Sequence, residues 1–229
     1  MTTHSKRYKK LTRVVNQDAM DLADAVRKVK MLATAKFPET VELAIKLDID
    51  TKQANQQVRG SFTLPHGLGK TKRVIAFCAP DQVQSALDAG AIKAGLEDLV
   101  KEIEGGFMDF DVAVATPDSR KVIGKLGKLL GARGLMPNPK SGTVGPDIPL
   151  MVREFSAGKV EFRNDNTGNI HIPVGKANFE DQKLVENIRS FYMHILDRRP
   201  STVRGIYLRS AFISTTMSPS VRLKPLSKD

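Results

Sequence analysis

The residues GLGKT at positions 67–71 contain the Gly-Lys-Thr of a nucleotide-binding phosphate loop. In such a loop, backbone amides and the lysine hold the phosphates of the nucleotide. The complete pattern requires a glycine five positions before Gly69, and Leu64 stands there. The loop should also connect a strand to a helix, whereas the run from Arg73 to Cys78 that follows it is typical of a strand. We therefore expect no ATP-binding site at this position.

The side chains that usually carry metal or hydrolytic chemistry are scattered. The four histidines lack the spacing of metal ligands, and one cysteine, Cys78, cannot build a zinc site. No G-x-S-x-G motif supplies a nucleophile. Asp48 with Asp50 and Asp109 with Asp111 stand at expected strand ends without a neighbouring histidine, so solvated strand ends explain them better than catalysis. The sequence predicts a protein that is not an enzyme and holds no cofactor or metal.

The chain is strongly basic, which points to a polyanionic partner. It has 229 residues, a formal net charge of +11 and a hydrophobic content of 41%, enough to bury a core. Basic surfaces bind nucleic acid or anionic lipid by releasing counterions. No apolar run reaches the length of a membrane span, so nucleic acid is favoured and no membrane partner is expected. The single cysteine and the polar first residues favour a cytoplasmic protein.

Residues 120–145 form the most distinctive basic run. They include six cations, six glycines and no acidic residue. Apolar residues at helical spacing predict a helix in the first half, and the prolines at 137 and 139 predict a loop after it. Two interpretations stay open: a glycine-rich loop that approaches phosphates, or a solvated helix followed by a rigid connector.

The expected elements come in two styles. Short apolar runs at 74–79 and 112–115 alternate with helical patterns and predict a parallel, wound sheet in the middle of the chain. The flanking parts predict an antiparallel style with long helices. It includes strands over 40–50, 58–64 and 203–217 (with a bulge near Ser210), a hairpin of 159–163 with 170–174, helices over 18–35 and 179–196, and basic tails at 1–14 and 219–229.

Charge divides the chain in the same way. Residues 1–66 and residues 158–229 each hold twelve Lys and Arg against seven Asp and Glu, whereas residues 67–157 hold twelve against eleven. Neither outer segment has enough elements to bury a core alone. We therefore expect 1–66 and 158–229 to fold together as one discontinuous basic domain, with the near-neutral domain 67–157 inserted between them. Three consecutive units are the alternative.

Composition also indicates how an RNA would be bound. Aromatic residues make up 6% of the chain and tryptophan is absent, so stacking of splayed bases is not expected to dominate. Recognition of a folded RNA through its shape, phosphates and 2′-hydroxyls fits better. For Glu42, accepting a hydrogen bond from RNA and forming a cross-strand salt bridge remain alternatives. The candidate contacts, on strand 40–50 and the last strand, are Lys36, Phe37, Thr40, Glu42, Lys46, Ser210, Thr215, Thr216 and Met217.

Five segments between Lys36 and Arg222 resemble one family. They are KFPETVELAIKLDID, QVRGSFTLPHGLGK, GARGLMPNPKSGTV, GKVEFRNDNTGNIHIPVGK and LRSAFISTTMSPSVR. Together they are similar to the bacterial-type L-one family of large-subunit ribosomal proteins, which belong to the mobile ribosomal stalk. The resemblance implies a mixed α/β and α+β fold: a discontinuous α+β RNA-binding domain with an inserted Rossmann-like, three-layer α/β domain.

The resemblance further implies partners and contact residues. The expected partners are large-subunit rRNA, the exit-site tRNA that is released when deacylated, and the mRNA of the chain's own operon, which such proteins commonly repress. The protein is expected to be a monomer within the ribosome. Ser218 stands where the family usually has glycine, which leaves the backbone beside Met217 open. The family's rRNA-contacting positions match Phe37, Thr40, Ser210, Thr216 and Met217, and less closely Lys36, Glu42, Lys46 and His171. A nucleotide-dependent enzyme and a free DNA-binding regulator are the rival hypotheses.

Overall fold

The computed structural model describes residues 5–15 and 18–226 and has a mixed α/β architecture with several sheets. The chain forms two compact units. The split unit contains the chain up to Gly69 and from Phe162 onward, and the central unit is Lys70–Glu161. No helix in the described part of the chain is long and apolar enough to cross a membrane.

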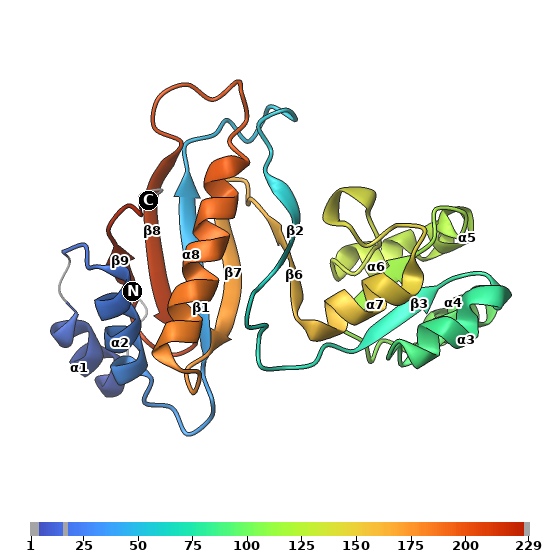
Figure 1. Cartoon of the computed structure of the whole chain (residues 1–229), viewed down its shortest axis with the longest axis horizontal. Helices are drawn as coiled ribbons and strands as arrows, with labels where there is room; N and C mark the ends of the chain where they lie inside the picture. The colour runs from blue at the N-terminus through green and yellow to red at the C-terminus, as the bar shows by residue number, and fades with distance from the viewer. Residues whose placement is uncertain (1–4, 16–17, 227–229) are drawn as a thin grey trace. The chain divides into compact units, whose positions relative to one another are not determined.

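The split unit is built on a four-stranded antiparallel sheet (Figure 1). Its central strand β1 pairs on one side with β7 and on the other with β8. The two distant parts of the chain therefore share one sheet. In spatial order the strands are β7 (Asn169–Lys176), β1 (Thr40–Leu47), β8 (Leu208–Thr215) and β9 (Val221–Leu223).

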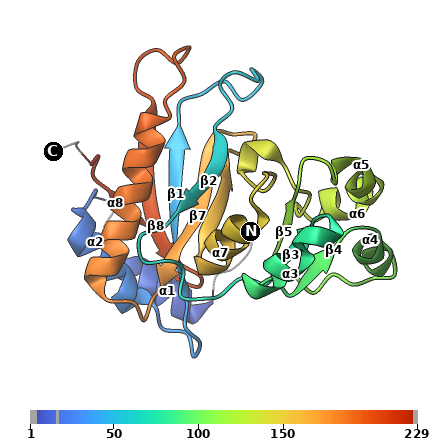
Figure 2. The same cartoon turned by 45° about the vertical axis from the view of Figure 1, so that its right-hand side comes forward.

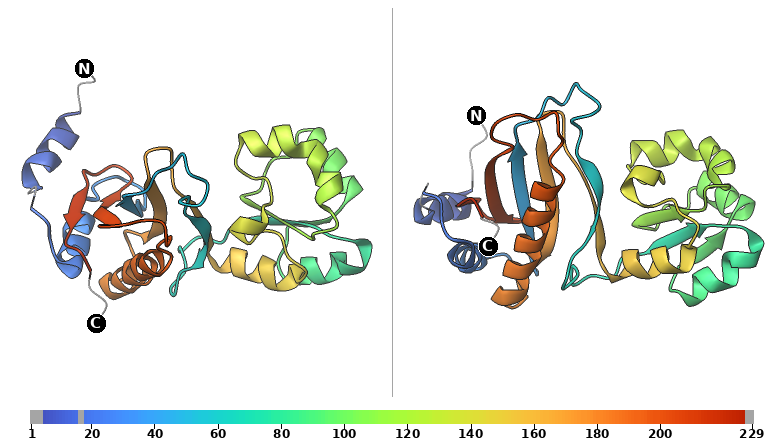
Figure 3. Two further views of the ribbon diagram at one scale, coloured as in Figure 1. Left: turned by 90° about the horizontal axis from the view of Figure 1, so that it is seen from above. Right: turned by 45° about the horizontal axis from the view of Figure 1, so that its top comes forward.

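Alternation along β1 gives this sheet one buried and one open face. Every second residue from Val41 to Leu47 is at most 1% exposed, because successive strand side chains point to opposite sides. The buried face packs against α2 (Leu22–Leu32) and α8 (Asp181–Asp197), whose apolar residues recur at helical spacing. A further helix, α1 (Lys6–Val14), buries none of its residues and lies apart from this helical layer (Figure 3).

The predicted hairpin of 159–163 with 170–174 is wrong. β6 (Lys159–Arg163) pairs with β2 (Arg59–Thr63), while β7 joins the four-stranded sheet. The turn between β6 and β7 forms one isolated antiparallel β-bridge, between Asn164 and Ile170. Aromatic packing explains the outcome: the rings of Phe62 and Phe162 lie 5.6 and 5.2 Å from the ring of Phe191 on α8. Contacts between distant residues thus override a local turn signal.

The central unit contains a parallel three-stranded sheet in the order β4 (Lys93–Gly95), β3 (Val74–Phe77), β5 (Val112–Ala115) (Figure 2). Helices cover both faces, and β3 is buried throughout, which is why its sequence is wholly apolar. The helices are α3 (Pro80–Asp88) and α7 (Ile148–Ala157) on one face, and α4 (Glu97–Glu104), α5 (Arg120–Ile123) and α6 (Gly127–Ala132) on the other.

The basic run at 120–145 is less regular than the single helix that its spacing predicts. α5 and α6 are separated by a 3-10 turn over Gly124–Leu126, and Gly124 and Gly127 stand at the two joins. Glycine lowers the cost of departing from α-helical geometry. A second 3-10 turn covers Pro139–Ser141.

Both predicted tails contain regular secondary structure within their described residues. The expected tail 1–14 contains α1, and the expected tail 219–229 contains β9, in which Val221 and Leu223 are buried against β8. Residues 1–4 and 227–229 lie outside the described residues. The bulge near Ser210 is confirmed, because the pairing of β1 with β8 shifts register between Lys46 and Leu47.

Candidate nucleic-acid interface

The open face of the four-stranded sheet gathers polar side chains from all its strands. Ala44 of β1 lies opposite His171 of β7 and Phe212 of β8, and Phe212 lies opposite Arg222 of β9. Residues directly opposite in antiparallel strands point to the same side. We call this surface the strand face. Its residues are Glu42, Ala44, Lys46, Asn169, His171, Pro173, Ser210, Phe212, Ser214 and Arg222.

The strand face contains four of the predicted contact residues: Glu42, Lys46, His171 and Ser210. The neighbours of Glu42 across the strands are Pro173 and Ser214, neither of which is charged, so the predicted alternative of a cross-strand salt bridge is wrong. The carboxylate of Glu42 is therefore directed outward from a strand without a cationic partner opposite it.

Five more predicted residues lie at one end of the same sheet. The amide of Thr216 donates to the carbonyl of Thr40 at 3.1 Å, and the amide of Thr40 donates to Oγ1 of Thr216 at 3.0 Å. Phe37 is 50% exposed and Met217 is 45% exposed. Thr215, the tenth candidate, is 3% exposed and lies on the buried side of β8, so it is not available to a partner. We call this surface the sheet end, formed by Lys36, Phe37, Thr40, Thr216 and Met217.

Glu39 holds the sheet end together, and the sequence interpretation missed it. Its carboxylate accepts hydrogen bonds of 2.9 Å from the amides of Ala35 and Met217, and the residue is 1% exposed. Burial alone would raise the pKa of Glu39, but these amide hydrogen bonds outweigh it and lower the pKa below 4.5. An acidic residue on the inward side of a strand that begins at Thr40 is the signal that could have identified it.

Two cations also reach the sheet end without having been predicted. Lys176 Nζ donates to Oγ1 of Thr40 at 2.7 Å. The guanidinium of Arg7, on α1, donates to Oγ1 of Thr34 and to the carbonyl of Met217, both at 3.2 Å. These contacts place positive charge beside hydroxyl groups, as a phosphate-binding surface requires.

Ser218 fits the turn that follows β8. Its Oγ accepts a 3.0 Å hydrogen bond from the amide of Thr215 and donates to the carbonyl of Pro219 at 3.1 Å. None of the described residues other than glycine has a positive φ, so this turn does not need glycine at position 218. The turn beside Met217 is therefore stabilised by hydrogen bonds of the Ser218 hydroxyl.

Lys46 contacts a turn beside the strand face. Its ammonium group donates to the carbonyl of Thr167. That turn is closed by Asp165, whose carboxylate accepts hydrogen bonds from the amides of Thr167 and Asn169, both at 2.8 Å. Although the burial of Asp165 opposes ionisation, these hydrogen bonds hold its pKa well below its usual range. Because the partner of Lys46 is a neutral carbonyl, its positive charge is not cancelled there.

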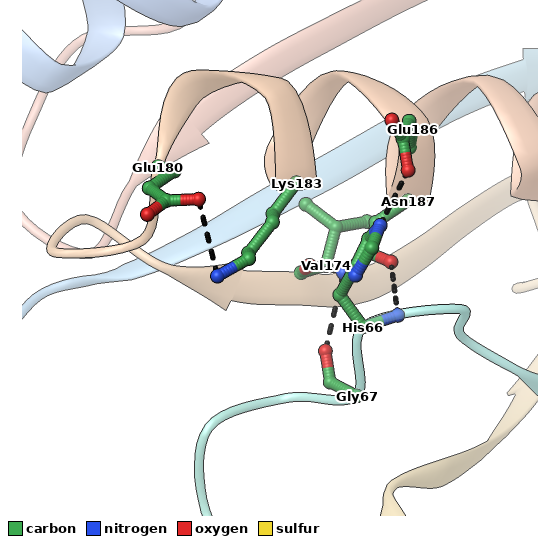
Figure 4. A network of polar contacts seen from close by, with 7 residues as sticks. All are labelled: His66, Gly67, Val174, Glu180, Lys183, Glu186 and Asn187. Carbon is green, nitrogen blue, oxygen red and sulfur yellow. Dashed lines mark hydrogen bonds and ion pairs between the residues drawn. The ribbon is translucent and has the colours of Figure 1, made fainter.

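The phosphate-loop-like run serves a structural role. Asn187 of α8 accepts from the amide of His66 at 3.0 Å and donates to the carbonyls of Gly67 and Val174 at 3.1 and 2.8 Å (Figure 4). His66 also contacts Glu186. The chain then continues into β3 rather than into a helix, so the setting of a phosphate loop is absent at these residues.

Three of the four carboxylates in the two pairs contact an arginine, and Asp50 accepts hydrogen bonds from the amide of Lys52 and from the side chain of Gln53. Asp109 and Asp111 both contact Arg73, which lowers the pKa of Asp111. Asp48 lies 3.0 Å from the guanidinium of Arg209. Across the described residues, no cluster of three or more His, Cys, Asp or Glu side chains could hold a metal ion.

The basic run on the central unit presents its cations to solvent. All six of them are exposed, whereas Leu126 and Leu130 between them are buried. Both interpretations of this run, as a phosphate-binding loop and as a solvated helix with a connector, remain compatible with this placement. The six are Arg120, Lys121, Lys125, Lys128, Arg133 and Lys140.

Comparisons with known proteins agree on one family. A family model described as the Ribosomal protein L1p/L10e family matches residues 26–219. The chain is 50% identical over 227 residues to the large ribosomal subunit protein uL1 of Thermosipho melanesiensis, covering 98% of each chain. It is 52% identical over 225 residues to the uL1 protein of Fervidobacterium nodosum, covering 97% of this chain and 96% of that one. It is 50% identical over 229 residues to a uL1 protein of Thermus thermophilus, covering 99% and 100%. The chain therefore belongs to the Ribosomal protein L1p/L10e family.

Proposed function

We propose that this chain is a structural constituent of the large ribosomal subunit and binds large-subunit rRNA through the strand face and the sheet end. The observation that carries the proposal is the clustering of nine of the ten predicted contact residues on these two adjoining surfaces. The names of its relatives, large ribosomal subunit proteins, support the same partner. As a member of a family of structural ribosomal proteins, the chain is not an enzyme.

The chemistry of the two surfaces suits a folded RNA. The strand face offers hydroxyls at Ser210 and Ser214, a carboxylate acceptor at Glu42 and a cation at Lys46. Hydroxyl and carboxylate groups recognise 2′-hydroxyls and base edges, while lysine contacts phosphates. An antiparallel sheet is a rigid support, so these groups are held in place before the RNA arrives.

We infer that the two units have different roles. The split unit is the discontinuous RNA-binding domain, supported by the pairing of β1 with β7 and β8 and by the excess of cations in both of its segments. The central unit is an inserted Rossmann-like domain, supported by its parallel sheet with helices on both faces.

We further propose that the protein builds the mobile stalk with this rRNA and works as a monomer on cytoplasmic ribosomes. It assists release of deacylated tRNA from the exit site, and it represses the mRNA of its own operon. Repression follows if the mRNA folds like the rRNA site, since both would then compete for the same strand face.

A competition experiment tests the proposed function. The labelled probe is a large-subunit stalk rRNA fragment, and the competitors are the operon's mRNA leader, deacylated tRNA and duplex DNA at equal salt. We expect the mRNA leader to displace the fragment, and duplex DNA to need a far higher concentration. Equal competition by duplex DNA would instead favour a free DNA-binding regulator.

A further inference from the structure

A groove lies between α1 and the open side of strands β8 and β9. Its volume is about 430 Å³, within the usual range of small-ligand sites. Phe212 and Arg222, which line it, are cross-strand partners on the strand face. The groove is therefore continuous with the surface proposed to bind rRNA. Its lining includes Tyr8, Thr12, Phe212, Pro219, Ser220 and Arg222.

One wall of the groove, helix α1, is positioned without contributing to the core. None of its residues is buried, and the guanidinium of Arg7 ties it to Thr34 and to the carbonyl of Met217. Ordering a nine-residue helix costs conformational entropy that apolar burial usually offsets. Here that compensation is small, which argues that α1 serves a partner at this surface.

Positive charge lies in the groove at Arg222 and around it on α1, whose cations do not line the groove themselves. The sequence of α1, KRYKKLTRV, has five cations and no acidic residue. Arg222 adds an exposed guanidinium on the opposite wall. Cations of this density bind phosphates by counterion release.

The remaining lining suits a nucleoside. The ring of Phe212 offers a stacking surface, and every base can stack on an aromatic ring. Thr12 and Ser220 are exposed and supply hydroxyls that can bond a ribose. The hydroxyl of Thr12 does so as an acceptor, because it donates its hydrogen to the carbonyl of Tyr8 at 2.9 Å. Ring, hydroxyls and cations thus supply the three kinds of group that would contact the base, sugar and phosphate of a nucleotide.

We propose that this groove binds one unpaired nucleotide of the RNA held on the strand face. Its base stacks on Phe212 and its phosphate contacts Arg222, while the cations of α1 add positive charge around the groove. This inference rests on the proposed function and adds to it a single-stranded contact beside the folded-RNA surface. Stacking at one site is compatible with an interface that otherwise recognises shape.

Affinity measurements with the full-length protein and the stalk rRNA fragment test the groove. Phe212→Leu is expected to weaken binding by roughly 5- to 100-fold, the range for loss of one stacked base. Arg222→Gln is expected to lower the slope of log affinity against log salt by about one. Arg204→Gln, which removes an exposed cation that does not line the groove, is the matched control and is expected to leave affinity for specific RNA near the wild-type value.

A second test avoids any change to the sheet. Thr12 is exposed on α1, so Thr12→Glu places a negative charge in the groove without altering a strand. It is expected to weaken binding of the same fragment severalfold. In addition, a fragment carrying 4-thiouridine at its unpaired positions is expected to crosslink to Tyr8 or to Phe212, with the crosslinked residue identified by fragmentation of the peptide.

Three results separate the two proposals. If Phe212→Leu, Arg222→Gln and Thr12→Glu bind like the wild type while Thr216→Ala binds weakly, the groove is not a nucleotide site and the proposed function stands. If crosslinks map to strand-face or sheet-end residues other than Phe212 and Arg222, and to no residue that lines the groove, the same conclusion holds. If the wild-type protein does not bind the fragment, the proposed function and the groove fail together.

Discussion

Single residues at the sheet end combine structure with recognition. Glu39 is buried with two amide donors on its carboxylate, so it fixes the backbone that carries Phe37 and Met217. Because its pKa in the folded protein lies below the ordinary value of 4.5, it contributes stability that is present above pH 4.5 and is lost as the pH falls through the folded pKa.

Glu39→Gln is expected to destabilise the protein by about 1–3 kcal/mol at pH 7, because the amide nitrogen of glutamine cannot accept one of the two hydrogen bonds. The difference between the variant and the wild type in free energy of unfolding is expected to shrink below pH 4.5. Urea unfolding at pH 7 and at pH 3.5 or below measures both. Glu42→Gln, at an exposed carboxylate on strand β1, which follows Glu39, is the control and should change stability by less than about 0.5 kcal/mol. A pH-independent loss for Glu39→Gln would rule out this account of the carboxylate.

Thr216→Ala tests recognition at the same place. Its hydroxyl accepts from the amide of Thr40 and is exposed to a partner. We expect weaker binding of the stalk rRNA fragment at an unchanged salt slope, since no charge is removed. Thr216→Ser restores the hydroxyl and is expected to recover most of the affinity. Equal loss in both variants would show that the methyl group, not the hydroxyl, matters.

Lys46→Ala is expected to change the salt dependence of RNA binding, which Thr216→Ala leaves unchanged. Removing a phosphate contact weakens binding to all sequences and flattens the salt slope by about one. Measurement of affinity at several salt concentrations checks this. An unchanged slope would mean that Lys46 only closes the turn at Thr167, which its ammonium already contacts.

Helices and strands with a clear hydrophobic period could be predicted from the sequence. The alternation over 40–50 predicted a strand with one open face, which the structure shows ending three residues earlier, at Leu47. Helical spacing predicted α2 and α8, because each pattern reports directly which side is buried. The pairing of β6 with β2 could not be predicted in this way. It depends on Phe62 and Phe162 meeting α8, a contact between distant residues that no local pattern encodes.

The residues of the candidate site also divide into those that local sequence patterns predict and those that contacts between distant segments bring together. Outward residues such as Glu42 and Lys46 follow from the period of the strand. Glu39, Lys176 and Arg7 join the sheet end through hydrogen bonds between segments far apart in sequence. Among the contact residues, His171 came from the resemblance to a known family alone.

The loop from His66 to Gly69 gives a prediction at the element scale. Asn187 is fully buried and bonds three backbone groups, so Asn187→Ala leaves the amide of His66 and two carbonyls without this partner. A loss of about 2–4 kcal/mol is expected in chemical unfolding. Glu186→Gln alters only the half-exposed contact with His66 and should cost less than about 1 kcal/mol. Similar losses for both would show that the loop is not held by Asn187.

At the scale of the whole molecule, two units of different style share one chain. The split unit has an antiparallel sheet with one open face, and the central unit has a parallel sheet covered on both faces. Covered sheets leave no strand surface for a polynucleotide, whereas an open face does. We therefore expect specific RNA binding from the split unit, although the central unit carries the most basic run of the sequence.

The most direct measurement compares the affinity of three proteins for the stalk rRNA fragment. They are the full chain, residues 1–69 joined to 158–229 by a short Gly-Ser linker that keeps β6 whole, and residues 70–161 alone. The account predicts that the joined protein retains specific binding within about tenfold, roughly 1.4 kcal/mol, of the full chain, and that residues 70–161 bind no better to this fragment than to unrelated RNA. Specific binding by residues 70–161, with none by the folded joined protein, would contradict it.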